Sequence, residues 1–167
     1  MATTETLMVV STLEKVTVGE SFDSLPPHMT IFPWFDLDET LISTFESDMQ
    51  EIVMHNTVAL PEGGSSCLFG KDESTTVRRF DVATFGFNVI QHFNIHASVF
   101  RSVNELGGTY DPTYVGLNYA PHVTQSEERS VYQGEVVLLD NLTVFKKDIA
   151  RRKKLVQAMY VWDKING

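Results

Sequence analysis

The feature that most constrains this chain is a tetrapeptide that occurs twice, Pro-His-x-Thr. The first copy is Pro27-His28-Met29-Thr30 and the second is Pro121-His122-Val123-Thr124. In each copy a histidine and a threonine are two residues apart, and on a β-strand this spacing places both side chains on the same face. A lone copy would be unremarkable, but two copies with the same flanking proline are rare by chance. The repeat predicts two similar strands that meet around one site.

Length and charge limit the kind of protein this can be. The chain has 167 residues and a net charge of −9, and we expect residues 1–167 to form a single domain. Proteins that grip long RNA or DNA normally carry a basic surface. A small nucleotide therefore fits the charge better than a nucleic-acid polymer. Oligomeric state cannot be read from the sequence.

Cysteine content and hydropathy indicate the compartment. Cys67 is the only cysteine, so the chain has no internal disulfide and this residue alone cannot make a zinc site. No apolar run approaches the roughly 20 residues that a membrane-spanning helix needs. The first six residues include no lysine or arginine, and no signal-peptide core follows them. We expect a cytoplasmic protein without membrane contact.

Periodicity predicts two long helices among short strands. The first helix opens at Asp38-Glu39 and carries an apolar stripe at spacings of three and four, while the second spans Phe85 to Leu106 and ends at Gly107-Gly108. A strand from His28 to Phe32 should end at Pro33, because proline cannot donate to a neighbouring strand. It would place His28, Thr30 and Phe32 on one face. The other predicted strands are 7–13, 57–60, 66–69, 75–82, 134–139, 142–147 and 154–163.

These elements predict an α+β fold. Strands and helices do not alternate strictly, which favours largely antiparallel sheets. Each Pro-His-x-Thr motif falls in a half of the chain with strands and one long helix. We therefore expect an internal pseudo-duplication folded around one cleft.

Two imidazoles and two hydroxyls suit acid–base chemistry on a phosphate ester. Imidazole titrates near pH 6.5, so one histidine can accept a proton while the other donates one. Each such transfer contributes roughly 10²–10⁴-fold in rate. Threonine hydroxyls aimed at developing charge add electrostatic stabilisation. This chemistry needs neither metal nor cofactor. Which histidine is acid and which is base depends on the ester bond that is cleaved.

The paired motifs resemble those of the two-histidine (2H) phosphoesterase superfamily. That group includes bacterial 2′–5′ RNA ligase-like proteins, eukaryotic cyclic phosphodiesterases and phage anti-CBASS nucleases, and its signature is a pair of His-x-Thr/Ser motifs, one per lobe. Here His28-Met-Thr30 and His122-Val-Thr124 match it, and Leu25 to Ile31 resembles the usual first-motif context. The strand near Leu142 to Lys146, followed by a last strand, resembles the C-terminal hairpin. Gln125 departs from the pattern, because the family more often has an apolar residue there.

The resemblance implies a bilobal, pseudo-twofold fold of two mainly antiparallel sheets around a central cleft, with a long helix in each lobe. It also implies a metal-independent phosphodiesterase acting on a small cyclic nucleotide or a short oligonucleotide. His28 and His122 would be the catalytic pair. Thr30 and Thr124 would bind the phosphate oxygens. The alternative is a binding protein that sequesters a cyclic nucleotide without cleaving it, although such a protein would not need both intact motifs. A scaffold role, with both His–Thr pairs buried, is a further alternative.

Several other residues could contribute to a nucleotide site. Trp34 and Tyr119 flank the two motifs and could each stack on a base, worth roughly 1–3 kcal/mol, although most aromatic residues must be core. His92 and His96 are spaced i, i+4 on the second helix, as in some zinc sites, but no third ligand is apparent and we interpret them as ordinary helix-face residues. Six basic residues, 146, 147 and 151–154, could bind phosphate. The tip of a hairpin is the favoured interpretation.

Overall fold

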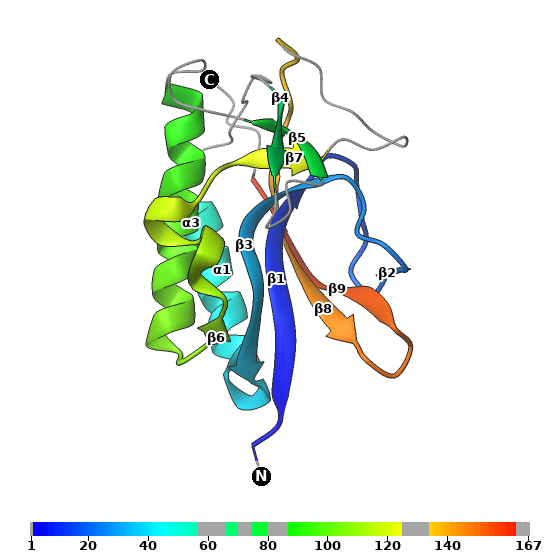
Figure 1. Ribbon diagram of the computed structural model, residues 1–167. Coiled ribbons are helices and arrows are strands. Elements are labelled where there is room, and N and C mark those ends of the chain that lie inside the picture. Colours follow the sequence, from blue (N-terminus) through cyan, green and yellow to red (C-terminus); the bar gives the residue numbers. More distant parts are fainter. Residues whose placement is uncertain (1, 57–65, 70–74, 80–86, 125–133, 163–167) are drawn as a thin grey trace.

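The strands in the described part of this protein form one sheet. The computed structural model describes residues 2–56, 66–69, 75–79, 87–124 and 134–162. Within these residues the order of the strands is β2-β9-β8-β1-β3-β7-β5-β4, and β6 pairs with β3 beside this path. Neighbouring strands are antiparallel, and the sheet is strongly curved (Figure 1). The strands are β1 Thr4–Thr12, β2 Ser21–Phe22, β3 His28–Asp38, β4 Ser66–Phe69, β5 Thr75–Arg79, β6 Thr109–Tyr110, β7 His122–Thr124, β8 Asn141–Asp148 and β9 Lys153–Val161.

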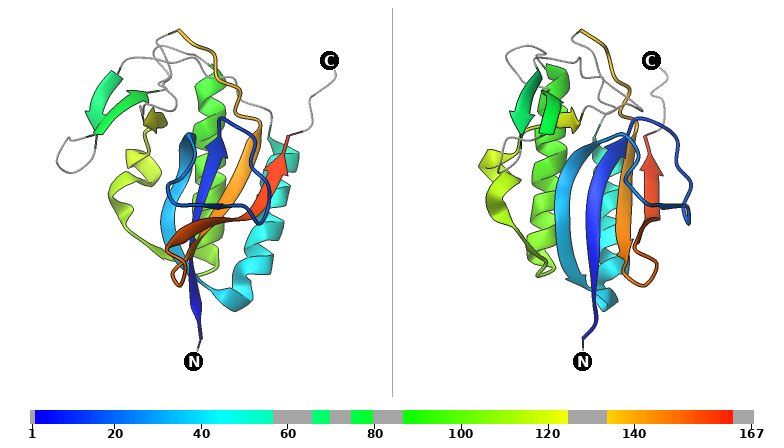
Figure 2. Two further views of the ribbon diagram at one scale, coloured as in Figure 1. Left: turned by 90° about the vertical axis from the view of Figure 1, so that its right-hand side faces the viewer. Right: turned by 45° about the vertical axis from the view of Figure 1, so that its right-hand side comes forward.

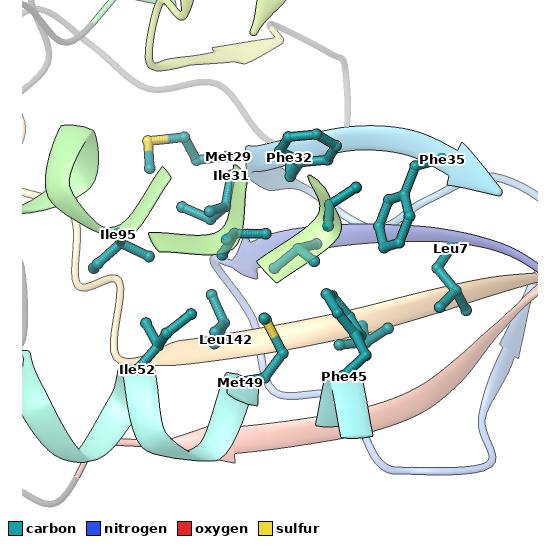
Figure 3. Packing of buried hydrophobic residues seen from close by; sticks show 14 of the residues in the cluster. Leu7, Met29, Ile31, Phe32, Phe35, Phe45, Met49, Ile52, Ile95 and Leu142 are labelled. Atoms are coloured by element: carbon teal, nitrogen blue, oxygen red, sulfur yellow. The ribbon is translucent and has the colours of Figure 1, made fainter. Parts of the chain in front are cut away.

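Two long helices, α1 (Ile42–His55) and α3 (Phe87–Glu105), cover the same face of the sheet (Figure 2). α1 packs on β9, α3 packs on β3, and the two helices contact each other. Their apolar stripes meet Leu7 and Val9 of β1 and the buried residues of β3 in the main core (Figure 3). In this core the rings of Phe35 and Phe45 pack edge to face, with centroids 5.2 Å apart. None of the helices in the described part of the chain is long and apolar enough to cross a bilayer.

The helix boundaries follow the signals in the sequence. Before α1, the carboxylate of Asp38 accepts the backbone N–H of Thr40 at 2.9 Å and caps a 3₁₀ turn, η1 (Glu39–Leu41). After α3, Gly107 has φ +75°, and the N–H of Gly108 donates to the carbonyl of Val103 at 2.8 Å. This is the left-handed helix end that glycine favours. Two further 3₁₀ turns, η2 (Pro112–Tyr114) and η3 (Gly116–Asn118), lead to β7.

The α+β class with antiparallel pairing is confirmed, but the expected two sheets are one. β3 and β7 pair directly at Met29 and Val123, which joins the strands on either side into a continuous sheet. The placement of one long helix in each lobe is not confirmed, because α1 and α3 pack together on one face. Spacing along the chain predicted the elements but could not predict which strands would meet, because pairing is a long-range interaction.

Pro33 does not end its strand, contrary to the expectation. β3 continues to Asp38, and its pairing with β1 shifts register between Phe35 and Phe32 and again between Phe32 and Thr30. A proline is tolerated at such an irregularity, where its missing N–H interrupts no regular ladder. The shifts also turn Phe32 into the main core with Met29 and Ile31, so its predicted place beside His28 and Thr30 was wrong.

Some of the other predicted strands are present in the structure and some are not. Residues 134–139 form isolated bridges and no strand, whereas β8 and β9 are close to their predicted positions. The strand predicted at 57–60 lies outside the described residues. The basic cluster does lie around the β8–β9 turn, as favoured. There Lys146 pairs with Glu5 at 3.0 Å and Lys153 with Asp23 at 3.2 Å, so part of its charge is neutralised locally.

Candidate active site

The two Pro-His-x-Thr motifs lie side by side on adjacent strands, β3 and β7. Met29 and Val123 are Cα partners in this antiparallel pair, and both side chains are fully buried. In an antiparallel ladder the next residues along also face each other. His28 is therefore opposite Thr124, and Thr30 is opposite His122. This arrangement relates the two motifs by a local twofold axis through the Met29–Val123 pair.

All four motif side chains project from the face of the sheet that lies away from the helices. Met29 and Val123 belong to the core under α1 and α3, and side chains alternate along a strand. Thr30 pairs with Val10 of β1, which belongs to a second, smaller cluster with Met8 and Phe145. His28, Thr30 and His122 are half-buried, and Thr124 is exposed. The helix-free face therefore carries the motif hydroxyls and imidazoles within reach of solvent.

Each of the two candidate catalytic histidines is held by a hydrogen bond to the backbone carbonyl two residues before it. Nδ1 of His28 lies 2.7 Å from the carbonyl oxygen of Pro26, and Nδ1 of His122 lies 2.7 Å from the carbonyl oxygen of Ala120. A carbonyl can only accept, so Nδ1 carries the hydrogen in both rings. In the neutral form Nε2 is then the basic nitrogen of each ring. The flanking residues thus fix the tautomer as well as the orientation.

The electrostatics of His28 reflect its burial and its neighbour. Burial lowers the pKa of His28 below its ordinary value, the bond to Pro26 offsets part of this effect, and the positive charge of His122 lowers the pKa further. Both lowering effects disfavour a proton on His28. The β3–β7 register places the two histidines diagonally across the Met29–Val123 pair, on the same face of the sheet. At neutral pH His28 is therefore mainly a neutral ring.

A small pocket opens beside Thr30 and His122. Its volume is about 130 Å³. Apart from these two residues its walls are largely apolar, formed by Met8, Pro33, Tyr114, Tyr119 and Ala120. On the other side of β7, the backbone register with β5 places Arg79 opposite His122. The site is thus a polar row of motif side chains flanked by an apolar recess.

The structure separates the two aromatic candidates. Tyr119 borders the pocket, but it is only 7% exposed and the ring of His96 is stacked on it, with centroids 4.0 Å apart and planes 2° apart. Trp34 lines a different pocket, of about 520 Å³, where Nζ of Lys147 lies 4.8 Å from the centre of its ring. A stacking role for either residue stays a prediction.

Sequence reasoning missed the structural importance of His96. We interpreted it as an ordinary helix-face residue, but it is 2% exposed and both ring nitrogens are hydrogen-bonded to backbone near the motifs. His92, one turn earlier, is 1% exposed. The available signal was periodicity, because Ile95, Val99 and Val103 place His92 and His96 on the buried stripe of the helix. A polar residue on an apolar stripe indicates a buried hydrogen-bonding role.

Comparisons with known proteins identify the class of fold. No protein-family model matches this chain, and no curated protein matches it by sequence. A solved crystal structure of a phosphoesterase superposes on it with a TM-score of 0.63, over 96% of this chain and 99% of the other. The two sequences are 9% identical. At that identity the match shows a shared fold, so this protein has the architecture of a phosphoesterase.

Proposed function

We propose that this protein is a metal-independent phosphodiesterase of the two-histidine type. Its substrate would be a small cyclic nucleotide or a short oligonucleotide. The observation that carries the proposal is the β3–β7 pairing, which brings two His–Thr pairs together with identically tethered imidazoles. The fold shared with a phosphoesterase supports the same reaction class. The pseudo-twofold relation of the motifs would place one phosphate between them.

In the proposed mechanism the two histidines exchange protons with opposite ends of the scissile bond. Because its pKa is lowered, His28 is suited to accept a proton from the attacking water or ribose hydroxyl. His122, in its protonated form, would donate a proton to the leaving oxygen. Thr30 and Thr124 would donate hydrogen bonds to the non-bridging phosphate oxygens and stabilise their charge in the transition state. The reverse assignment of acid and base would apply to a substrate bound in the opposite direction.

The charge of the chain supports a small substrate. A net charge of −9 opposes the binding of long nucleic acid, and local ion pairs neutralise part of the basic hairpin. A short phosphodiester held by directed hydrogen bonds depends less on a basic surface. We propose a cytoplasmic enzyme that acts on such molecules.

The test is a substrate panel read out by mass spectrometry. The panel contains 2′,3′-cyclic mononucleotides, cyclic dinucleotides and 2′–5′ and 3′–5′ linked dinucleotides, each incubated with and without EDTA. We expect turnover of at least one compound, unaffected by EDTA and lost in both His28→Ala and His122→Ala. His55→Ala, a change at the exposed last residue of α1, is the matched control.

Two outcomes would reject the proposal. Full activity in either motif variant would show that the histidines are not catalytic, and loss of activity with EDTA would show that a metal is required. Binding of a cyclic nucleotide without any product would instead identify the protein as a sequestering protein.

A further inference from the structure

His96 connects the strand of the first motif to the segment that leads into the second. On one side of its ring, Nδ1 lies 2.7 Å from the carbonyl oxygen of Ile31, the residue after Thr30 on β3. On the other side, Nε2 accepts the backbone N–H of Gly116 at 2.9 Å. Gly116 begins η3, six residues before His122. A single side chain of α3 therefore bridges both halves of the candidate site.

These two bonds allow only one form of the imidazole. The Gly116 N–H can only donate, so Nε2 must be unprotonated, and Nδ1 must carry the hydrogen that the Ile31 carbonyl accepts. Burial lowers the pKa of His96 below its ordinary value, although the bond to Ile31 offsets part of this effect. The ring is thus a neutral linker with one donor and one acceptor in fixed directions.

Tyr119 extends the connection to Thr30 itself. Its ring is stacked on His96, and its hydroxyl donates to the carbonyl oxygen of Thr30 at 2.9 Å. The chain then runs from Tyr119 through Ala120, whose carbonyl holds the His122 ring. The carbonyls of Thr30 and Ile31 are consecutive, so Tyr119 and His96 hold the backbone on both sides of that peptide.

The surroundings of His96 are aromatic. Its ring packs against Phe32 from β3, Phe100 from α3 and Tyr119 from the segment before β7. Of these three only Tyr119 titrates, and burial raises its pKa far above the usual range. His92 lies one turn earlier on the same helix. In the described part of the chain, no carboxylate or ammonium group hydrogen-bonds to His96 or pairs with it, so its two bonds to backbone groups dominate its polar interactions.

We propose that His96 is a positioning residue for the phosphodiesterase reaction. It contacts neither substrate nor reacting atoms, because it lies on the helix side of the sheet, behind the motif strands. Its role is to set the distance and angle between the Thr30 segment and the His122 segment. This inference rests on the proposed function, although its structural part can be tested separately.

The test compares His96→Phe with Phe100→Leu. The first change keeps a flat ring against Tyr119 and removes both hydrogen bonds. The second loosens the same aromatic cluster, in which the ring centroids of Phe100 and Phe32 are 6.2 Å apart, and leaves both hydrogen bonds of His96 in place. We expect His96→Phe to lower kcat by about 10²-fold with little change in KM, because small misplacements of reacting groups cost rates of that order. Phe100→Leu should change kcat less than threefold even if it lowers the melting temperature equally.

A spectroscopic measurement makes the test independent of turnover. In two-dimensional NMR spectra of the full chain, His96→Phe should shift the amide signals of Thr30 and His122. Phe100→Leu should leave these two signals near their wild-type positions, whereas the Gly116 signal is not used because the Phe100 ring lies next to Gly116. Nitrogen-15 spectra of the wild type should show His96 as the neutral Nδ1–H form at pH 7. Should His96→Phe fail to fold, His96→Leu takes its place, because leucine also removes both hydrogen bonds and should show the same loss of kcat. His96→Gln keeps one donor and one acceptor and should retain part of the activity.

The outcomes separate the two proposals. Equal kinetic losses in His96→Phe and Phe100→Leu, or motif amides that do not move in His96→Phe, would overturn the positioning role. An absence of turnover in the wild type across the substrate panel would reject the proposed function. In that case the amide shifts would still show whether His96 holds the two motif segments together.

Discussion

At the scale of single residues, the candidate site depends on hydrogen bonds between the motif histidines and backbone carbonyl groups. The carbonyls of Pro26 and Ala120, each two residues before a motif histidine, select the Nδ1–H tautomer in both rings. In a histidine ring, the hydrogen bond made by one nitrogen decides whether the other nitrogen is available for proton transfer. The motif spacing predicted which side chains share a face, whereas the role of the preceding carbonyls became visible only with the backbone path.

The hydroxyls of Thr30 and Thr124 can be tested with an isosteric change. Thr30→Val or Thr124→Val removes the hydroxyl and keeps the β-branched shape that suits a strand. If the hydroxyls stabilise transition-state charge, each variant should lower kcat by about 10²–10³-fold, the usual cost of losing one such donor. Steady-state kinetics on the substrate found in the panel would measure this.

Thr4→Val is the matched control, since Thr4 is an exposed strand threonine that pairs with Asp38 at the far end of β1. The control should retain wild-type rates. Rates within threefold of wild type in both motif variants would contradict the assigned role of the hydroxyls.

At the scale of elements, local signals placed the helices well and the strands less well. The Asp38 cap and the Gly107 end lie where the sequence predicted them, because caps involve residues only a few positions apart. The continuation of β3 through Pro33 was not predicted, because it depends on register shifts against β1. Strand limits are set by the partner strand, and a propensity rule cannot include a partner that is distant in sequence.

The end of α3 gives a stability prediction. Gly107 has φ +75°, and a Cβ added there would meet nothing within 4 Å. Gly107→Ala should therefore cost about 1–2 kcal/mol through backbone strain alone. Gly107→Asn should cost less, because asparagine tolerates this conformation. Urea unfolding of both variants and the wild type would measure the difference, and equal stability of the alanine and asparagine variants would show that strain is not the cause.

At the scale of the whole molecule, two half-buried or buried histidines couple stability to pH. The pKa values of His28 and His96 are lowered in the folded state, chiefly by burial. In the unfolded chain both groups bind a proton near pH 6.5, so the unfolded state takes up more protons as the pH falls through and below that value. Their contribution to the free energy of unfolding is therefore present above about pH 6.5 and decreases on acidification.

The measurement is the free energy of unfolding between pH 7.5 and pH 5. We expect the wild type to lose stability over this interval, and His96→Phe to lose less because it lacks one of the two coupled groups. Thr4→Val, an exposed change that removes no titratable group, should lose as much stability as the wild type. A pH dependence in His96→Phe as steep as that of the wild type would show that His96 does not contribute.

The sequence by itself determined the α+β class, the two helices, the basic hairpin turn and the four motif residues, because those features follow from spacing and from contacts between near neighbours. Tertiary structure decided the pairing of β3 with β7 and the merging of the expected two sheets into one. It also decided the burial of Phe32 in the main core and the two hydrogen bonds of the His96 ring. Each of these joins residues far apart in the chain. Such contacts form only when packing selects one register among many.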